Sequence, residues 1–168
     1  MINDHLSFSE YGLKLLQRFE GFRSYPYDDT TGRYITEWNS HATIGYGYLI
    51  SKKEWEIFKD GIDSAEAEIL FVKVTSTLED VLKRAITKPI EQHQFDALIL
   101  LAYNIGVSAF KNSSVVKMIN DPSAVTKYSS IELAWKAWNK QGGIVIHGLV
   151  NRRRMEWDLF ANSQYLVI

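Results

Sequence analysis

The longest uninterrupted helical pattern in the chain runs from about residue 63 to residue 86, and it restricts the folds that are possible. Asp63 followed by Glu66 resembles a capping box, the pairing that starts many helices, and Lys88-Pro89 ends the pattern. At ~1.5 Å per residue, such a helix spans on the order of 36 Å. That length is enough to connect a small lobe to a separate one.

The only segment that predicts β structure lies before this helix, between Tyr25 and Ile50. It is rich in Tyr, Thr, Gly and Asp, and its short apolar alternations are typical of a small antiparallel sheet with turns. A first helix precedes it, with Ser9 as a suitable N-cap and Gly21 as a C-terminal stop. We therefore expect a β-containing lobe over about residues 20–62.

The rest of the chain has the apolar periodicity of helices, broken by Gly and Pro. A short helical segment at 51–59 precedes the long helix, and Ser129 with Glu132 repeats the capping-box pattern further on. Together with the N-terminal helix, these helices predict a helical lobe over about residues 89–162. The whole chain of 168 residues is expected to be one α+β, mostly helical domain. The expected helices of this lobe are Glu91–Ile105, Ser113–Asn120, Ser130–Lys140 and Leu149–Phe160.

Composition excludes several classes of function. A net charge of −1 gives no global field for a nucleic acid, and the absence of cysteine excludes disulfides and thiolate metal sites. An aromatic content of 13% suggests a groove as well as a core. No metal or cofactor is expected, because the histidines lack ligand spacing and are expected at the surface or in caps: His5, His41, His93 and His147.

The start of the chain lacks a basic segment followed by an apolar run. No apolar stretch approaches the roughly 20 residues that are needed to cross a bilayer. We therefore expect synthesis in the cytoplasm without a signal peptide and no membrane insertion. If the substrate lies in the periplasm or the cell wall, release or injection must carry the protein there.

Two carboxylates and a hydroxyl, each at a probable element boundary, form the main chemical signal. Glu20 stands in Phe-Glu-Gly at the end of the first helix, Asp29 follows nine positions later, and Thr43 begins Thr-Ile-Gly-Tyr-Gly. Glycoside hydrolysis needs one acid that protonates the leaving oxygen and a second carboxylate in an unlike environment. The pattern supplies both.

The position of Glu20 at a helix C-terminus has an electrostatic consequence. The negative end of the helix dipole disfavours an ionised carboxylate by roughly 0.3–1 kcal/mol, which is too little for a general acid working near neutral pH. Burial against Phe19, Phe22 or Tyr25 would have to supply most of the remainder. Without it, Glu20 reads as a surface residue that closes an amphipathic helix.

Each signal also has an ordinary structural explanation. Asp29 could form an Asx-turn with the polar residues before Gly32, and the same explanation applies to Asp28. The two glycines after Thr43 could mark a close approach of the backbone, more often to another strand than to a ligand. What favours a site is the order and spacing of the three signals on one short segment.

With these motifs the chain resembles the phage-type lysozymes, the endolysins of glycoside hydrolase family 24. Their pattern is Glu-Gly, then a Tyr-x-Asp-x-x-Gly turn, then Thr-Ile-Gly-x-Gly, and all three blocks are present. The likeness covers about Leu13 to Leu159. Its further blocks are Gln94–Leu98, Ala102–Gly106, and Gly142–Arg153 with Glu156.

The resemblance implies a lysozyme-like fold and a bacteriolytic muramidase, which cuts the β-1,4 bond between N-acetylmuramic acid and N-acetylglucosamine in peptidoglycan. Glu20 matches the family's general acid, Asp29 its second carboxylate, and Thr43 the hydroxyl beside the attacked sugar carbon. An inverting reaction is implied, with Asp29 and Thr43 holding the water. Asn104 matches a groove position that contacts substrate. Arg153 is a weaker candidate for orienting the acid, since a solvated helix face explains an Arg run equally well.

Two departures from the family concern the groove. The insertion at 33–42 is longer than the family's tight turn, and it carries His41 and Trp38, which is the tryptophan most expected to touch glycan. We expect this insertion to form part of the substrate or inhibitor rim. Tyr48 stands where the family usually has His, so the hydrogen bond of that histidine must be replaced or absent. Three other tryptophans are expected in the core: Trp135, Trp138 and Trp157.

Other functions stay open at this point. A lytic transglycosylase needs one acid and no water, whereas Asp29 and Thr43 favour hydrolysis. A non-catalytic peptidoglycan-binding or interaction module would keep the groove without turnover. A phage endolysin and an injected antibacterial toxin both fit, and the toxin would have a dedicated immunity or inhibitor protein. We expect a monomer with no nucleic-acid partner.

Overall fold

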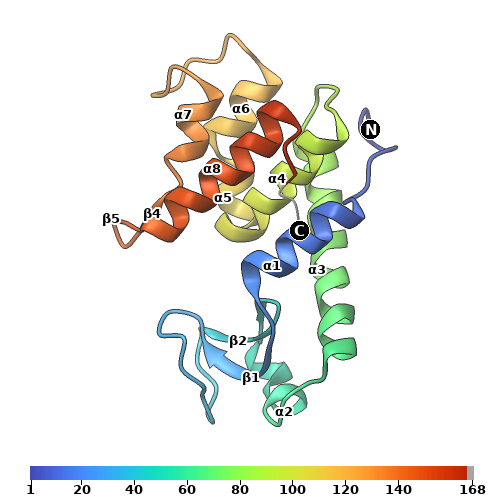
Figure 1. Ribbon diagram of the computed structural model, residues 1–168, viewed down its shortest axis with the longest axis vertical. Coiled ribbons are helices and arrows are strands. Elements are labelled where there is room, and N and C mark those ends of the chain that lie inside the picture. The colour runs from blue at the N-terminus through green and yellow to red at the C-terminus, as the bar shows by residue number, and fades with distance from the viewer. Residues whose placement is uncertain (166–168) are drawn as a thin grey trace. The chain divides into compact units, whose positions relative to one another are not determined.

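The computed structural model describes residues 1–165, and the chain divides into two compact units. The first unit comprises Met1–Leu13 and the chain from Thr77 onward, and the second comprises Lys14–Ser76. The boundaries fall within two helices, α1 (Glu10–Glu20) and α3 (Ser64–Ala85) (Figure 1). The α+β, mostly helical class predicted from the sequence is confirmed.

Helices α1 and α3 begin and end where the sequence signals predict. The Ser9 hydroxyl caps the amino end of α1. Helix α1 ends at Glu20, before Gly21, whose φ of 67° favours glycine. The predicted capping box of α3 is present, because the Asp63 amide donates to Glu66 Oε2 (3.0 Å) and the Glu66 amide donates to Asp63 Oδ1 (2.8 Å).

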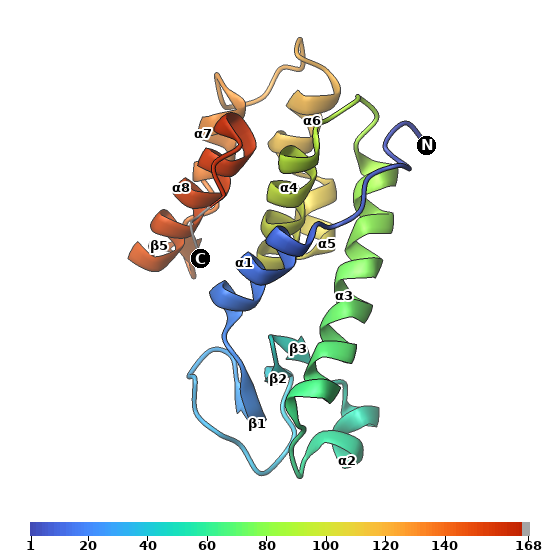
Figure 2. The ribbon, with the colours of Figure 1, turned by 45° about the vertical axis from the view of Figure 1, so that its right-hand side comes forward.

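The second unit contains the predicted antiparallel sheet, with strand order β1-β2-β3. Tyr27 on the first strand pairs with Thr43 on the second, which also pairs with Leu49 on the third (Figure 2). This register places the Tyr-x-Asp turn and the Thr-Ile-Gly strand next to each other. The elements are β1 (Arg23–Asp28), β2 (Ala42–Gly45), β3 (Tyr48–Leu49), the 3₁₀ turn η1 (Lys52–Glu54) and α2 (Trp55–Phe58).

The core of the second unit lies where the sheet packs against α3. Gly45 makes this packing possible, because a Cβ atom there would lie 3.3 Å from the Cβ of Ala67 and the residue has a φ of 66°. The sequence favoured another strand over a ligand as the neighbour of this glycine, and Gly45 does pair with Arg23 of the first strand, with α3 as its second neighbour. The buried core residues are Ala42, Ile44, Ile50, Trp55, Ile62 and Ala67.

The first unit contains five further helices among the described residues. Helices α4 and α8 pack against each other and lie side by side in Figures 1 and 2. Every residue of α4 from Phe95 to Ala102 is buried, which makes α4 the central helix of this unit. The helices are α4 (Gln92–Ile105), α5 (Val107–Lys111), α6 (Ser114–Asn120), α7 (Ile131–Lys136) and α8 (His147–Asn162).

A second small sheet corrects the prediction that residues 25–50 hold the only β structure. Strands β4 (Lys140–Gln141) and β5 (Ile144–Val145) form a hairpin. Its turn is Gly142-Gly143, with φ values of 55° and 83°. Two glycines with positive φ are what a two-residue hairpin loop requires.

The same hairpin explains why α7 is shorter than predicted. The helix expected to reach Lys140 ends at Lys136, because the chain turns into β4. Its N-cap is Ser130, whose hydroxyl accepts a hydrogen bond from the Leu133 amide (3.2 Å), and not Ser129 as the capping pattern suggested. Helix α5 was not predicted, since the sequence showed only a break at Gly106.

A buried carboxylate in the first unit gathers distant parts of the chain. Asp96 on α4 is fully buried and accepts hydrogen bonds from the Ser9 amide (3.0 Å) and the Ser9 hydroxyl. It also accepts from Gln92 Nε2 (2.9 Å) and from the Tyr165 hydroxyl (2.6 Å). Burial, then the bond to Asp96, raises the pKa of Tyr165. No helix within residues 1–165 is both long and apolar enough to cross a membrane.

Candidate active site

His41 lies in contact with the two residues that were expected to handle water. Its carbonyl oxygen accepts hydrogen bonds from the Asp29 amide (3.1 Å) and from the Thr43 hydroxyl (3.0 Å). Its imidazole Nδ1 lies 3.2 Å from Asp29 Oδ1. Asp29 and Thr43 are therefore held by one residue of the insertion at 33–42.

The three side chains differ in how far solvent reaches them. Those of Asp29 and His41 are about half exposed, at 46% and 52%, whereas Thr43 is 3% exposed. The Thr43 hydroxyl already donates its proton to a carbonyl, so towards another partner it can only accept. The small exposed surface of Thr43 suits contact with a water molecule better than contact with a sugar ring.

Asp28 has a separate, structural role. Its Oδ1 accepts hydrogen bonds from the Thr30 hydroxyl (2.5 Å), the Thr30 amide (2.9 Å) and the Thr31 amide (3.0 Å). Its Oδ2 accepts from Asn39 Nδ2 (3.1 Å). The hydroxyl of Thr30 foremost, with the two amides and Asn39, lowers the pKa of Asp28 to about 2. The Asx-turn that the sequence left open for both aspartates is made by Asp28.

The pKa of Tyr27 depends on the charges of both Glu20 and Asp29. Burial raises the pKa of this tyrosine, the negative charge of Glu20 raises it further, Arg23 lowers it and Asp29 raises it. The charges of both carboxylates thus act on the pKa of the same phenol. The Arg23 guanidinium lies over the Tyr27 ring, 4.5 Å from its centroid. Glu20 itself is half buried at the last position of α1.

Two of the rings that were expected to bury Glu20 are themselves largely exposed. Phe22 is 42% exposed and packs on Tyr46, with ring centroids 5.6 Å apart. Tyr25 is 56% exposed and packs edge-on against Tyr34. These two rings therefore supply little burial, and the aromatic residue that the sequence analysis overlooked is Tyr27. Its signal was present, since it is the tyrosine of the Tyr-x-Asp motif.

The insertion at 33–42 is anchored at Trp38. The indole Nε1 donates to the Ile50 carbonyl (2.9 Å), and the ring packs against the core of the second unit. Trp38, the tryptophan most expected to touch glycan, is therefore half buried. A ring in this position fixes the insertion and keeps only part of its surface for a ligand.

Tyr48, which stands where the family usually has His, bonds to a helix-capping carboxylate. Its hydroxyl donates to Glu54 Oε1 (2.6 Å), and Glu54 Oε2 accepts from the Ser51 amide and hydroxyl. Burial, then the bond to Glu54, raises the pKa of Tyr48 to about 12. The Tyr48–Glu54 hydrogen bond therefore stands where the family usually has a bond from histidine.

In the first unit, the predicted residues Asn104 and Arg153 belong to one hydrogen-bonded network. Arg153 Nη2 donates to Asn104 Oδ1 and to Glu156 Oε1, each at 2.8 Å. Glu156 also accepts from Arg152 Nε and from Trp135 Nε1, each at 3.0 Å. Trp135 is fully buried, as predicted for the core.

This network corrects the interpretation of the arginine run as a solvated helix face. Arg153 has no exposed surface and Arg152 is 9% exposed, while Arg154 alone faces solvent. Arg153 thus has no exposed surface to offer a ligand, and its guanidinium bonds to Asn104. Asn104 is exposed near the end of α4, and its amide Nδ2 is the donor that it can offer to a ligand.

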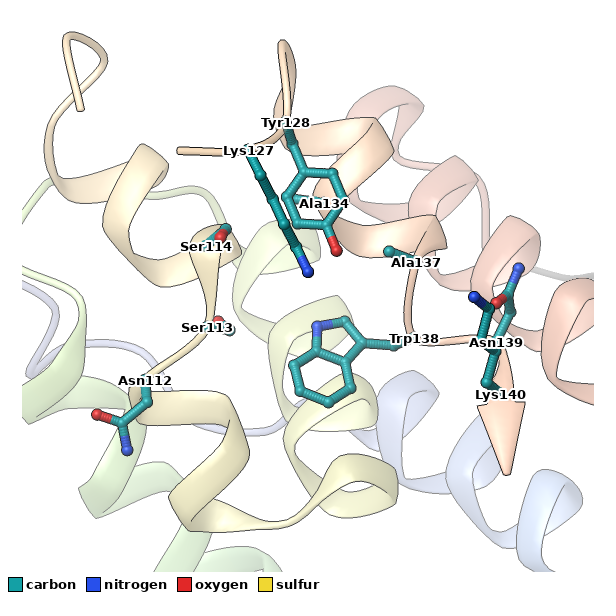
Figure 3. Close-up of a pocket in the computed structure, with 10 residues that line it drawn as sticks. All are labelled: Asn112, Ser113, Ser114, Lys127, Tyr128, Ala134, Ala137, Trp138, Asn139 and Lys140. Atoms are coloured by element: carbon teal, nitrogen blue, oxygen red, sulfur yellow. The ribbon is translucent and has the colours of Figure 1, made fainter. Parts of the chain in front are cut away.

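A cavity of about 650 Å³ opens in the first unit, close to the end of α7. The side chains of Lys127, Tyr128 and Trp138 point toward one another inside it (Figure 3). The Lys127 ammonium lies 5.1 Å from the Tyr128 ring centroid. Trp138 is half buried here, so its prediction as a core residue was wrong. Ammonium, hydroxyl and indole groups together suit a ligand that is rich in oxygen acceptors.

No group of three or more His, Asp or Glu side chains among the described residues is arranged to hold a metal ion. The polar side chains described above bond to one another or to the main chain. The chemistry that they can offer is proton transfer and hydrogen bonding.

Comparisons with known proteins show what this chain is similar to. Residues 17–156 match the family model described as phage lysozyme. The endolysin of Bacillus phage PZA is 34% identical over 155 residues, which are 92% of this chain and 55% of that protein. This chain thus spans about half the length of that endolysin.

Solved structures show the same fold. The endolysin from Escherichia coli O157:H7 phage FAHEc1 superposes with a TM-score of 0.73 at 29% identity, over 97% of this chain and 98% of that chain. The muramidase domain of SpmX from Asticaccaulis excentricus superposes with a TM-score of 0.73 at 25% identity, over 94% of this chain and 99% of that chain.

Proposed function

Because the chain belongs to the phage lysozyme family, we propose that the protein is a glycoside hydrolase that degrades bacterial peptidoglycan. We further propose that it acts as a muramidase, at the β-1,4 bond between N-acetylmuramic acid and N-acetylglucosamine. The observation that carries this proposal is that Asp29 and Thr43 both bond to the His41 carbonyl, on the β segment that directly follows Glu20 at the end of α1. Two carboxylates around one bond are the usual means of hydrolysing glycosides.

In the proposed reaction Glu20 is the general acid. Its proton goes to the glycosidic oxygen as the bond from that oxygen to the anomeric carbon breaks. A water attacks the anomeric carbon from the opposite face and loses a proton to Asp29. The sugar therefore gains the water's hydroxyl, and the anomeric configuration inverts.

The hydrogen bonds around Thr43 support a defined orientation of this water. Its hydroxyl can only accept, since its own proton is donated to the His41 carbonyl, and the ionised Asp29 carboxylate can only accept as well. A water that donates one hydrogen to each has its oxygen lone pair left for the anomeric carbon. The 3% exposure of Thr43 is consistent with a partner of that size.

Two further residues are proposed to contact the glycan. The Asn104 amide Nδ2 would donate to a hydroxyl or acetamido oxygen, with Arg153 fixing the amide through Oδ1. The partly exposed ring of Trp38 would pack against a sugar face. The earlier idea that Arg153 orients the general acid stays a prediction.

The direct test of the proposal is Glu20→Gln, a change that keeps the shape of the side chain but removes the acid. We expect the turnover of purified peptidoglycan to fall by at least about a hundredfold, with an unchanged thermal midpoint. Glu68→Gln, the same change at an exposed glutamate of α3, is the matched control and should leave turnover unaltered. A folded Glu20→Gln protein that still hydrolyses peptidoglycan would refute the assignment.

Mass spectrometry of the digest separates the alternative functions. Fragments with reducing ends, heavier by one water, support hydrolysis. Anhydromuramic ends would identify a lytic transglycosylase, and binding without fragments would identify a non-catalytic module. NMR of the first product tests inversion of the β bond, which requires the α-anomer to appear first.

A further inference from the structure

Within the insertion at 33–42, the side chain of His41 lies against the Asp29 carboxylate. Its Nδ1 lies 3.2 Å from Asp29 Oδ1, and its carbonyl accepts from both the Asp29 amide and the Thr43 hydroxyl. A single residue thus contacts both groups that are proposed to hold the attacking water. The Tyr-x-Asp and Thr-Ile-Gly motifs do not include this histidine.

We propose that His41 is a positioning residue for hydrolysis, which orients the Asp29 carboxylate toward the water; this inference rests on the proposed function of Asp29. A half-exposed aspartate can rotate about both of its side-chain torsions. The main-chain bond from its amide fixes only the backbone. An imidazole at Oδ1 restricts the carboxylate and leaves Oδ2 to accept from the water.

The imidazole is itself well placed to give such support. The His41 amide donates to Asn39 Oδ1 (2.8 Å), while the His41 carbonyl accepts from two donors. Its backbone is thus bonded on both sides, and only two side-chain torsions separate the ring from it. A support held in this way is pre-organised before a substrate binds.

A purely structural role explains the contact less well. The insertion is fixed without the imidazole, because Trp38 Nε1 bonds to the Ile50 carbonyl and Asn39 Nδ2 bonds to Asp28 Oδ2. The Asp28 amide also bonds to the Arg33 carbonyl (2.9 Å). Moreover, pairs as exposed as Asp29 and His41 contribute little to stability. The effect of the imidazole is therefore expected on the reaction and not on the fold.

The test compares two substitutions of His41 in the full chain. His41→Phe keeps a ring but removes the nitrogen, whereas His41→Asn keeps a nitrogen donor near the position of Nδ1. We expect His41→Phe to lower kcat by about tenfold to a hundredfold with little change in KM, as misplacement of a reacting group does. His41→Asn should restore kcat to within about threefold of the original protein. Both proteins should keep the original thermal midpoint.

Two controls make the result specific. His5→Phe, at an exposed histidine of the first unit, should leave kcat unchanged. In an Asp29→Asn background, His41→Phe should cause little further loss, because a residue that acts through Asp29 has no effect once that carboxylate is gone. An additive loss would show that His41 acts elsewhere.

The inference is overturned if His41→Phe retains full kcat, or if His41→Asn is as slow as His41→Phe. If either result is found and the Glu20→Gln protein is inactive, only the role of His41 is rejected, and the proposed function stands. An active Glu20→Gln protein would instead reject the proposed function on which the inference depends.

Discussion

The polar cluster of the first unit is buried, whereas that of the second unit is partly exposed. We expect the first to contribute mainly to stability and the second to reactivity. In the first unit, side chains bond directly to other side chains in the interior, and Glu156 has no exposed surface. In the second unit, Asp29 and His41 are about half exposed, and a main-chain carbonyl supplies the link to Thr43. The buried cluster comprises Trp135, Arg152, Arg153 and Glu156.

The two arrangements predict unlike consequences for the same chemical change. Removing one partner of a buried ion pair leaves an uncompensated charge in a medium of low dielectric and costs about 3–5 kcal/mol. An exposed pair contributes roughly 0–1 kcal/mol, because water and salt screen it. An exposed carboxylate can therefore be substituted with little loss of stability, so the effect of the substitution on the reaction can be measured in a folded protein.

The largest effect is expected for Glu156→Gln, which would break the buried side of the comparison. Arg153 and Arg152 would lose their anion, and we expect the free energy of unfolding to fall by about 3–5 kcal/mol in urea titrations. Glu132→Gln is the matched control, since its ion pair with Lys136 joins two partly exposed side chains and is worth only about 0.3–0.5 kcal/mol. Equal losses in the two variants would contradict the contrast.

An intermediate effect is expected for Asp29→Asn, which tests the exposed side. We expect kcat to fall by about tenfold or more, because the amide cannot accept a proton from the water, while the urea midpoint stays unchanged. Asp28→Asn should keep most of the activity, since Asp28 is engaged with Thr30, Thr31 and Asn39. A severe loss in Asp28→Asn beside an active Asp29→Asn would mean that the two aspartates have been assigned to the wrong roles.

The smallest effect concerns the pH dependence of the turn at Asp28. Its pKa is lowered from 3.8 to about 2 by the hydrogen bonds of the turn, first of all from the Thr30 hydroxyl. Such a group adds stability above its unfolded pKa, and this contribution is lost as the pH falls through the folded pKa. The Thr30 and Thr31 amide resonances of the folded protein should therefore titrate with a midpoint near pH 2, and not near the ordinary pKa of 3.8.

The control for this titration is again a neighbouring substitution. Asp28→Asn should abolish the change at both threonine amides, whereas Asp29→Asn should preserve it. A titration that survives in Asp28→Asn would show that another acid holds the turn.

Sequence patterns predicted the elements whose signals are local. Ser9, Gly21 and the Asp63 and Glu66 pair act through bonds to their own helix ends, so capping rules located α1 and α3. The membership in the phage lysozyme family, inferred from motif order, is likewise confirmed. Hydrogen bonds between residues that are close in the sequence can thus be predicted without knowledge of the fold.

What the sequence did not predict depends on contacts between distant residues. The burial of Arg153 follows from the packing of α8 against α4, and its partner Asn104 lies forty-nine positions away. His41 lies beside Asp29 because β1 and β2, on either side of the insertion, pair with each other. The catalytic roles of Glu20, Asp29 and Thr43 remain predictions.

The carboxylate of Asp96 has a consequence for chain connectivity. Ser9 before α1 and Tyr165 after α8 both bond to it, so one carboxylate connects two segments that lie far apart in the sequence. The carboxylate would therefore still connect these two segments if the chain were cut at the exposed turn Gly142-Gly143, which lies between them in the sequence.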